Sequence, residues 1–161
     1  FVQRGYKRGV PMGSDLKGSG KAPTFMVTAL KDPKSGNLDR VQIVKGWVDA
    51  KGAQHEKIYD VAWSGDRKPD AAGKLPAVGN TVDLKTGKYA NSIGSASLAS
   101  TWTDPEFDPK VRAFYYARVL EIPTPRWSTI AAAKLGVPIP GKLPVSIQER
   151  AWSSPIWYQP G

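Results

Sequence analysis

The chain has 161 residues, 16 glycines, 14 prolines, no cysteine and a net charge of +9. This length suits one domain with its own core, and the lack of cysteine excludes disulfides, thiolate nucleophiles and cysteine-based zinc sites. The basic residues are scattered among acids, which favours a solvated surface over a nucleic-acid interface. No apolar run approaches the roughly 20 residues of a membrane span, so we predict none.

Residues 1–22 are predicted to form an irregular basic N-terminal segment, because glycine recurs there among lysines and arginines. The run Gly18-Ser-Gly-Lys21 lacks the spacing of a phosphate-binding loop, and proline follows two positions after Lys21. The chain opens on Phe1 instead of methionine. We therefore expect that it was cut or processed from a longer protein.

Residues 23–161 are predicted to form one β-sandwich domain with an aromatic C-terminal tail. Short runs of strand-forming residues alternate with turns rich in glycine, proline and aspartate, which is typical of sandwiches. The firmest local prediction is a hairpin of residues 40–48 and 55–63 around the turn Asp49–Gly52. The other predicted strands are 24–30, 81–84, 92–102, 113–122 and 145–151.

The stretch 113–127 begins as the clearest strand of the chain and ends at Pro123, so we predict that it lies in the middle of the sheet. A short helix is predicted over residues 129–135, capped by Ser128 or Thr129 and ended by Gly136. The fold class is therefore all-β: an antiparallel, immunoglobulin-like β-sandwich of about seven short strands with one helix. In such sandwiches a tyrosine hydroxyl ties a corner to the backbone, a role predicted for Tyr115 or Tyr116.

The residue pattern gives little evidence for a metal site or for the catalytic residues of a hydrolase. The single histidine, His55, excludes a three-histidine metal site, and no nucleophile elbow accompanies it for a serine triad. Asp104, Glu106 and Asp108 alternate and are candidates for a Ca²⁺ site. The flanking Asp-Pro steps favour a stiff loop closed by Asx turns instead.

Glu121 and Glu149 are candidates for a general acid and base, because glycoside hydrolysis uses two carboxylates. Nothing in the sequence sets their separation, and the simpler interpretation makes them ion-pair partners of nearby arginines. The arginines concerned are Arg118, Arg126 and Arg150.

Six tryptophans are many for a chain of this length. They can line a sugar-binding face, since aromatic rings stack on the apolar faces of sugars, or they can form the core and an interface with another domain. The core and interface interpretation is favoured. The residues are Trp47, Trp63, Trp102, Trp127, Trp152 and Trp157.

Five blocks carry a family resemblance that extends over nearly the whole chain: residues 8–16, 45–49, 59–64, 113–127 and 148–158. With these blocks the chain resembles the C-terminal portion of a bacterial family catalogued as domain of unknown function 3604. The resemblance implies an exported, periplasmic protein whose N-terminal part is similar to metal-dependent phosphoesterases of the polymerase-and-histidinol-phosphatase type. With one histidine here, the metal ligands of such an enzyme cannot be placed on this chain.

These observations predict a non-catalytic accessory β-sandwich that packs aromatic surface against the N-terminal part of the same protein. No catalytic residue and no cofactor is assigned to the chain itself. The alternative from another class is a carbohydrate- or polyanion-binding module. A third hypothesis, a self-contained enzyme, requires convergence of carboxylates from Asp104, Asp108, Glu121 and Glu149 in one pocket.

Overall fold

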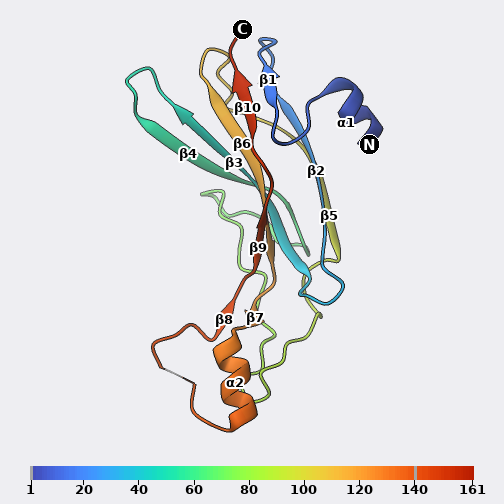
Figure 1. The fold of residues 1–161 in the computed structure, drawn as a ribbon, viewed down its shortest axis with the longest axis vertical. Helices are drawn as coiled ribbons and strands as arrows, with labels where there is room; N and C mark the ends of the chain where they lie inside the picture. The colour runs from blue at the N-terminus through green and yellow to red at the C-terminus, as the bar shows by residue number, and fades with distance from the viewer. Residues whose placement is uncertain (1, 140) are drawn as a thin grey trace.

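A computed structural model describes residues 2–139 and 141–161, and in this part of the chain ten strands and two short helices form (Figure 1). The helices are α1 (Val2–Arg8) and α2 (Trp127–Leu135). The longer strands are β2 (Thr24–Leu30), β3 (Leu38–Val48), β4 (Gln54–Trp63), β5 (Ser97–Thr103) and β6 (Ala113–Glu121). The shorter strands are β1 (Asp15–Lys17), β7 (Thr124–Pro125), β8 (Ser146–Ile147), β9 (Arg150–Trp152) and β10 (Ile156–Gln159).

The main sheet has the order β1-β10-β6-β3-β4, and β9 pairs with β6 beyond the end of β10. All pairs are antiparallel except β1 with β10. Strand β6 lies between β3 on one side and β9 and β10 on the other, so the prediction of a central strand is confirmed. Strands β7 and β8 form a separate two-stranded pair.

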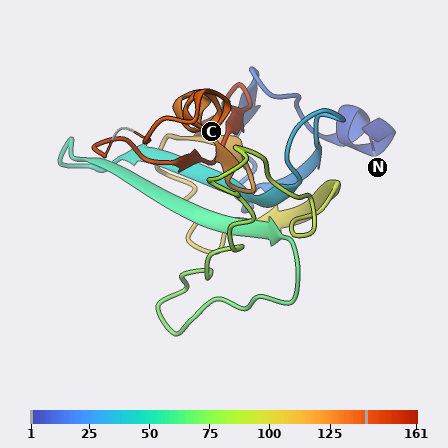
Figure 2. The same cartoon turned by 90° about the horizontal axis from the view of Figure 1, so that it is seen from below.

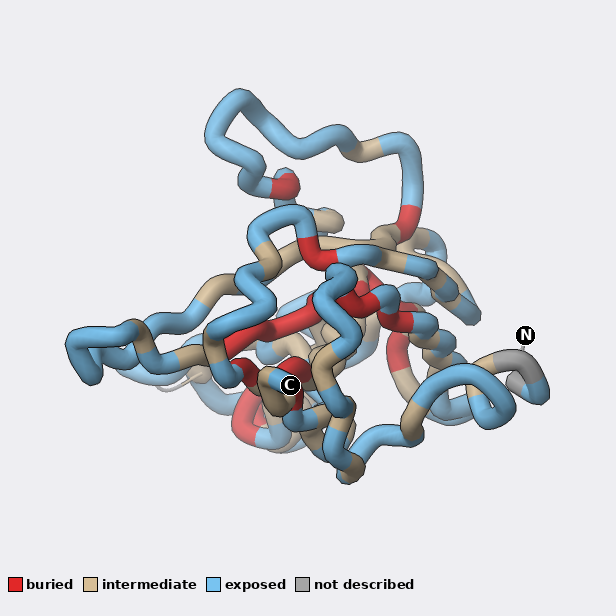
Figure 3. The backbone as a smooth tube through the Cα atoms, turned by 90° about the horizontal axis from the view of Figure 1, so that it is seen from above, coloured by how far each residue is buried: buried red, intermediate tan, exposed pale blue. Residues whose placement is uncertain are grey.

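A second layer, the two-stranded sheet of β2 and β5, packs on one face of the main sheet. The rings of Phe25 in β2 and Tyr115 in β6 pack at a tilt with centroids 4.6 Å apart, and the ring of Trp102 in β5 lies 4.7 Å from that of Tyr59 in β4. The buried core lies between the layers, along the strands that Figure 3 marks as buried. Two packed layers of mainly antiparallel strands confirm the all-β sandwich.

The predicted hairpin is confirmed as β3 and β4. Its turn is fixed by Asp49, whose carboxylate accepts hydrogen bonds from the backbone N–H groups of Lys51 and Ala53, both at 2.9 Å. Gly52 supplies a φ of 83°, which side chains disfavour. Local chemistry therefore sets this hairpin.

The prediction of an irregular segment over residues 1–22 is wrong for two stretches. Residues Val2–Arg8 form α1, and Asp15–Lys17 form β1, which pairs with the C-terminal strand β10. Leu16 of β1 packs against the core, so the segment belongs to the sandwich. The sequence does not reveal this pairing, because it joins the two ends of the chain and leaves no local pattern.

Three predicted strands also differ from the structure. Residues 81–84 form no strand; Asp83 and Lys88 make one isolated bridge around a turn of residues 84–87. The strand expected at 92–102 begins only at Ser97, after the positive φ of Gly94. The strand expected at 145–151 divides into β8 and β9, and the aromatic tail supplies β10. The count therefore rises from about seven strands to ten, because the short strands pair with distant partners that no local pattern specifies.

Helix α2 lies at the far end of the molecule from the N-terminal helix (Figure 1). Gly136 ends it with a φ of 66°, as predicted. The predicted cap is wrong: Arg126 occupies the N-cap without a side-chain cap bond, and the buried Thr129 hydroxyl donates to the Val145 carbonyl at 2.7 Å. In the described part of the chain, no helix has both the length and the apolar character needed to cross a membrane.

Candidate functional site: an apolar groove between the layers

An open groove of about 1110 Å³ lies between β2 and the β6, β9 and β10 side of the main sheet. We call it the β2 groove. Every residue from Pro23 to Leu30 lines one wall, and residues 151–154 with Ile156 line the other. The segment from Gly9 to Met12 lies at its rim. The groove therefore follows the whole length of one strand.

The alternation of β2 explains the floor of the groove. Phe25, Val27 and Ala29 turn toward the main sheet, whereas the residues between them are exposed. On the side that faces the main sheet, burial falls from Phe25, which is 9% exposed, to Val27 and Ala29, which are half-buried. Strand β2 therefore meets the main sheet most tightly near Phe25, and the space beyond it stays open.

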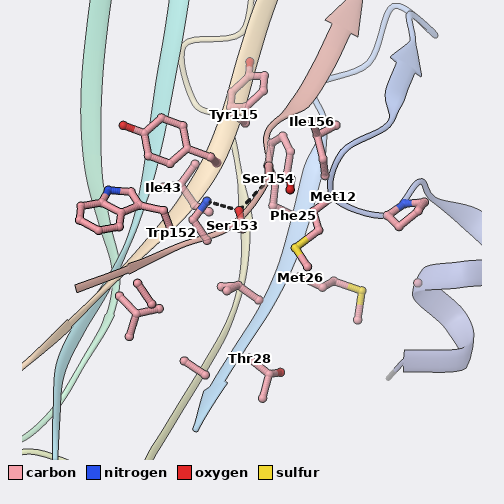
Figure 4. A pocket seen from close by; sticks show the side chains of 18 of the residues that line it. Met12, Phe25, Met26, Thr28, Ile43, Tyr115, Trp152, Ser153, Ser154 and Ile156 are labelled. Atoms are coloured by element: carbon pink, nitrogen blue, oxygen red, sulfur yellow. Dashed lines mark hydrogen bonds between the residues drawn. The ribbon is translucent and has the colours of Figure 1, made fainter. Parts of the chain in front are cut away.

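Apolar side chains surround this space, as Figure 4 shows for Met12, Met26, Trp152 and Ile156. Trp152 is 59% exposed and Met12 is 64% exposed. Large apolar side chains left in water cost free energy in proportion to their area, so a groove of this composition favours an apolar occupant.

The groove also has polar lining groups, among them hydroxyls and five charged side chains. Ser153 accepts a hydrogen bond from the Ala117 N–H at 2.9 Å and donates to the Ser154 carbonyl at 3.0 Å, so this hydroxyl is internally occupied (Figure 4). The charged lining residues are Arg8, Asp32, Glu121, Glu149 and Arg150. This lining provides binding surface and no obvious nucleophile.

Beneath the groove lies a buried polar cluster, formed by Lys45 of β3, Asp104 after β5 and Tyr115 of β6. The Lys45 ammonium donates to Asp104 Oδ2 at 2.6 Å and to the Glu106 carbonyl at 2.8 Å. The Tyr115 hydroxyl donates to the same Asp104 oxygen at 2.7 Å. All three side chains are at least nine-tenths buried, so the cluster fixes the loop after β5 to the main sheet.

The same cluster perturbs two tyrosines. Burial, with a further contribution from the charges of Asp104 and Glu106, raises the pKa of Tyr59 to about 12. Burial and then the hydrogen bond to Asp104 raise the pKa of Tyr115 as well. Both hydroxyls therefore stay protonated well above the range in which free tyrosine ionises.

This perturbation predicts alkaline destabilisation. Unfolded tyrosine ionises near pH 10, so between about pH 10 and pH 12 the folded state keeps protons that the unfolded state loses. The stabilisation from Tyr59 is thus complete below about pH 10 and is lost as the pH rises through about 12. Absorbance of tyrosinate at about 295 nm should show a late step that Tyr59→Phe removes and that urea unfolding shifts toward pH 10. A variant that titrates like the parent would contradict the assignment.

A second network holds the loop that follows β4. Arg67 Nη2 lies 2.8 Å from the buried Asp39 carboxylate, and Gln148 donates to the other oxygen of Asp39 at 2.9 Å. Arg40 also bonds Asp39, at 3.1 Å, and reaches Asp60 at 3.2 Å. This network anchors only the base of the loop, which then extends away from the sheet (Figure 2).

The structure separates the three calcium candidates. Asp104 is engaged by Lys45 and Tyr115, while the Glu106 carboxylate pairs with Lys57. The Asp108 carboxylate accepts the Lys110 N–H at 2.9 Å and so closes an Asx turn. Within the described residues, no group of three or more potential metal ligands occurs.

Glu121 and Glu149 are brought close, since the Glu121 N–H donates to the Glu149 carbonyl at 3.0 Å, and both line the groove. The Glu121 carboxylate accepts a hydrogen bond from Ser35 at 2.6 Å. Among the described residues, none of the arginines at 118, 126 and 150 forms an ion pair with either glutamate, so the ion-pair interpretation is wrong. Arg118 instead donates to Gln42 at 2.8 Å.

The six tryptophans do not form one surface. Trp47 and Trp102 pack against the core, and Trp63 donates to the Arg67 carbonyl at 2.7 Å. Trp152 lines the groove, whereas Trp157 contacts Phe114 with ring centroids 5.3 Å apart. Trp127 lies at the start of α2 and is 75% exposed.

The structure also places the single histidine and the tyrosine that ties a corner of the sandwich. His55 stacks on Trp47 and contacts the Asp49 carboxylate at 2.9 Å, at the hairpin end of β4. The tie from a tyrosine hydroxyl to a corner backbone is made by Tyr158, which donates to the Pro109 carbonyl at 2.9 Å. The Tyr115 hydroxyl reaches a side chain instead, so the corner prediction for this residue is wrong.

Sequence reasoning did not identify the groove, because Met12 and Met26 carry no recognisable motif. One signal was available: residues 24–30 form a strand without charge or proline, although strands at a sheet edge usually carry such residues. Only the paired layers reveal that this strand is an edge.

Comparison with known proteins supports the resemblance drawn from the five blocks. The model of one family, described as "Protein of unknown function (DUF3604)", matches residues 1–160. The searches of curated proteins and of solved structures found no match. Because the family model covers almost every residue of the sandwich and its groove, the chain belongs to the DUF3604 family.

Proposed function

We propose that this chain is a non-catalytic accessory β-sandwich at the C-terminal end of an exported, periplasmic protein of the metal-dependent hydrolase type. Its function is to bind the N-terminal part of that protein through the β2 groove and to shape the entrance to the active site there. The observation that carries the proposal is the open apolar groove, with Trp152 and Met12 largely exposed.

The total surface supports this role. The accessible surface is 10511 Å². A compact monomer of this mass, 17.5 kDa, exposes about 7,900 Å², so the chain carries an excess of about 2,600 Å². Interfaces of permanent complexes bury about 1,000–2,500 Å² on each partner. The excess is therefore large enough for a permanent interface with the rest of a longer protein.

The proposal expects no hydrolysis from the chain alone. Potential metal ligands are dispersed in the described residues, and the chain has one histidine. We expect no stoichiometric binding of Zn²⁺ or Mn²⁺ and no turnover of a phosphoester by residues 1–161. Metal binding together with turnover by this chain would contradict the proposal.

Docking is tested by a matched pair of tryptophan variants, Trp152→Ser and Trp127→Ser. Both side chains are well exposed, at 59% and 75%, but only Trp152 lines the groove. A tryptophan buried at an interface contributes about 2 kcal/mol or more, so Trp152→Ser should weaken binding to the separately produced N-terminal part by roughly thirtyfold. Trp127→Ser should leave binding unchanged, and calorimetry distinguishes the two results.

Equal binding by both variants would place the interface elsewhere and contradict the role of the groove. A glycan array and a salt titration of DNA binding complete the test. We expect flat responses in both, because the six tryptophans are spread over the molecule and the basic residues are scattered. A specific sugar or polyanion response would instead support a ligand-binding module.

A further inference from the structure

Strand β2 has one unpaired edge. In the described part of the chain it pairs with β5 alone. At the two ends of this pair, the Asp104 N–H donates to the Pro23 carbonyl and the Lys31 N–H donates to the Ala96 carbonyl. Antiparallel pairing alternates, so odd-numbered residues of β2 bond to β5 and the backbone groups of Met26, Thr28 and Leu30 point away from it.

This edge lacks the features that protect exposed edges. Residues 24–30 contain no charge and no proline. The edge strand of the main sheet, β4, carries Glu56, Lys57 and Asp60 instead. Exposed strand edges without charge or proline are templates for pairing with another strand, which implies that the β2 edge is covered in the assembled protein.

The second layer is also incomplete. Two strands cover a main sheet that is five strands wide along its hydrogen-bonded order. Strand β5 lies against β3 and β4, and Phe25 of β2 lies against β6. The groove occupies the remaining place beside β2, over residues of β1, β9 and β10, including Leu16, Trp152 and Ile156. One more strand at the β2 edge would complete the layer.

The dimensions of the groove suit an extended peptide. The seven residues of β2 span about 23 Å at about 3.3 Å per residue, and all of them line the groove. Its volume of about 1110 Å³ exceeds the roughly 300–1,000 Å³ usual for small-molecule sites. A second copy of the chain fits less well. The main sheet extends past β2 beneath the groove as β9, β10 and β1, so the main sheet of a copy paired at this edge would overlap these strands.

Charge at one end adds a further constraint on the occupant. Asp32, just past β2, lines the groove together with Glu121 and Glu149, and the basic lining residue Arg150 follows Glu149 in the chain. Ser35 connects Asp32 to Glu121 at this end of the groove. Its hydroxyl donates to the Glu121 carboxylate, and its backbone N–H donates to the Asp32 carbonyl. A lysine or arginine at the corresponding end of a bound strand complements this rim.

We propose that an extended segment of the N-terminal part of the same protein pairs with the free edge of β2 and completes the second layer of the sandwich. The segment has about six or seven residues, apolar side chains at alternate positions toward the main sheet, and a basic residue at the end that meets Asp32 and Glu121. This inference rests on the proposed function and specifies how the partner occupies the groove.

Hydrogen exchange of the chain alone and of the longer protein tests the pairing. The N–H groups of Met26, Thr28 and Leu30 should exchange at least about tenfold more slowly in the longer protein. Oxidative footprinting of Met12, Met26 and Trp152 in the same samples reports whether the groove is occupied at all. Slow exchange at the three amides together with protected side chains supports strand addition.

A matched pair of proline variants separates pairing from folding. Thr28→Pro removes an N–H that points to the free edge, whereas Thr101→Pro removes one from the opposite edge of the same two-stranded sheet. Thermal unfolding of the isolated chains should give similar Tm values for both. In the longer protein, Thr28→Pro should abolish the amide protection at Met26 and Leu30, and Thr101→Pro should preserve it.

The possible failures are distinguishable. Protected side chains with rapidly exchanging β2 amides would overturn strand pairing and leave the groove as an interface. Unprotected side chains and amides would overturn the proposed function as well. If the β2 amides of the isolated chain were protected in a concentration-dependent way and sedimentation showed a dimer, the occupant of the groove would be a second copy. That result would overturn pairing with the N-terminal segment.

Discussion

Asp104→Ala is expected to destabilise the fold by about 3–5 kcal/mol, because it leaves the buried Lys45 ammonium without its counter-charge. The Asp104 carboxylate accepts from Lys45 at 2.6 Å and from Tyr115 at 2.7 Å, and its other oxygen accepts the Glu106 N–H at 2.9 Å. Since Asp104 is 2% exposed, water cannot replace these bonds. Equilibrium unfolding in urea measures the loss.

The control is a double-mutant cycle with Lys45→Met, which keeps the apolar stem of the side chain. Each single variant leaves a buried charge unpaired, whereas Lys45→Met combined with Asp104→Ala removes both charges. The double variant should therefore lose clearly less stability than the sum of the two single losses. Additive losses, or a loss below about 1 kcal/mol for Asp104→Ala, would show that the pair contributes little.

Gly94→Ala is expected to cost about 2–5 kcal/mol from two independent sources. Gly94 has a φ of 80°, which costs an alanine about 1–2 kcal/mol. A methyl group there would lie 2.6 Å from Asn37 Cβ, 2.7 Å from Ile122 Cγ2 and 3.0 Å from the Leu38 carbonyl oxygen. Overpacking of this kind costs about 1–3 kcal/mol more, because the fully buried Ile122 has no free space to enter.

Gly73→Ala is the matched control, since its φ of 77° is similar and nothing lies within 4 Å of the added carbon. It should lose only the conformational part, about 1–2 kcal/mol. The difference between the two variants in urea unfolding then measures the steric part. Equal losses would mean that the segment between Asn37 and Ile122 yields to the methyl group without cost.

The predicted and observed elements of the fold differ in how far local sequence patterns determine them. The hairpin of β3 and β4 was predictable because Asp49 and Gly52 determine its turn within a few residues. The helix end at Gly136 was predictable for the same reason. The parallel pairing of β1 with β10 was not, because Asp15 and Trp157 meet across nearly the whole chain. Pairings of that kind depend on which edges remain free after the other strands have formed.

The candidate metal ligands were likewise not determined by local sequence patterns. Asp104, Glu106 and Asp108 had a spacing that permitted shared ligation, but their carboxylates turn to Lys45, Lys57 and a local backbone N–H. Alternation along a loop does not specify which partners the tertiary fold brings near each side chain. The groove residues had no motif at all, since apolar side chains at a wall and in a core look alike in sequence.

The amino-acid sequence alone predicts a β-rich domain with a central strand at residues 113–122, the main hairpin, and the resemblance to its family. These features follow from strand propensity, turn chemistry and long specific blocks, all of which are local. The buried cluster of Lys45, Asp104 and Tyr115 and the unprotected edge of β2 beside an apolar groove become visible only in the folded chain. The physical reason is that burial and strand pairing are properties of neighbours in space, and a two-stranded layer over a wider sheet leaves its edge open.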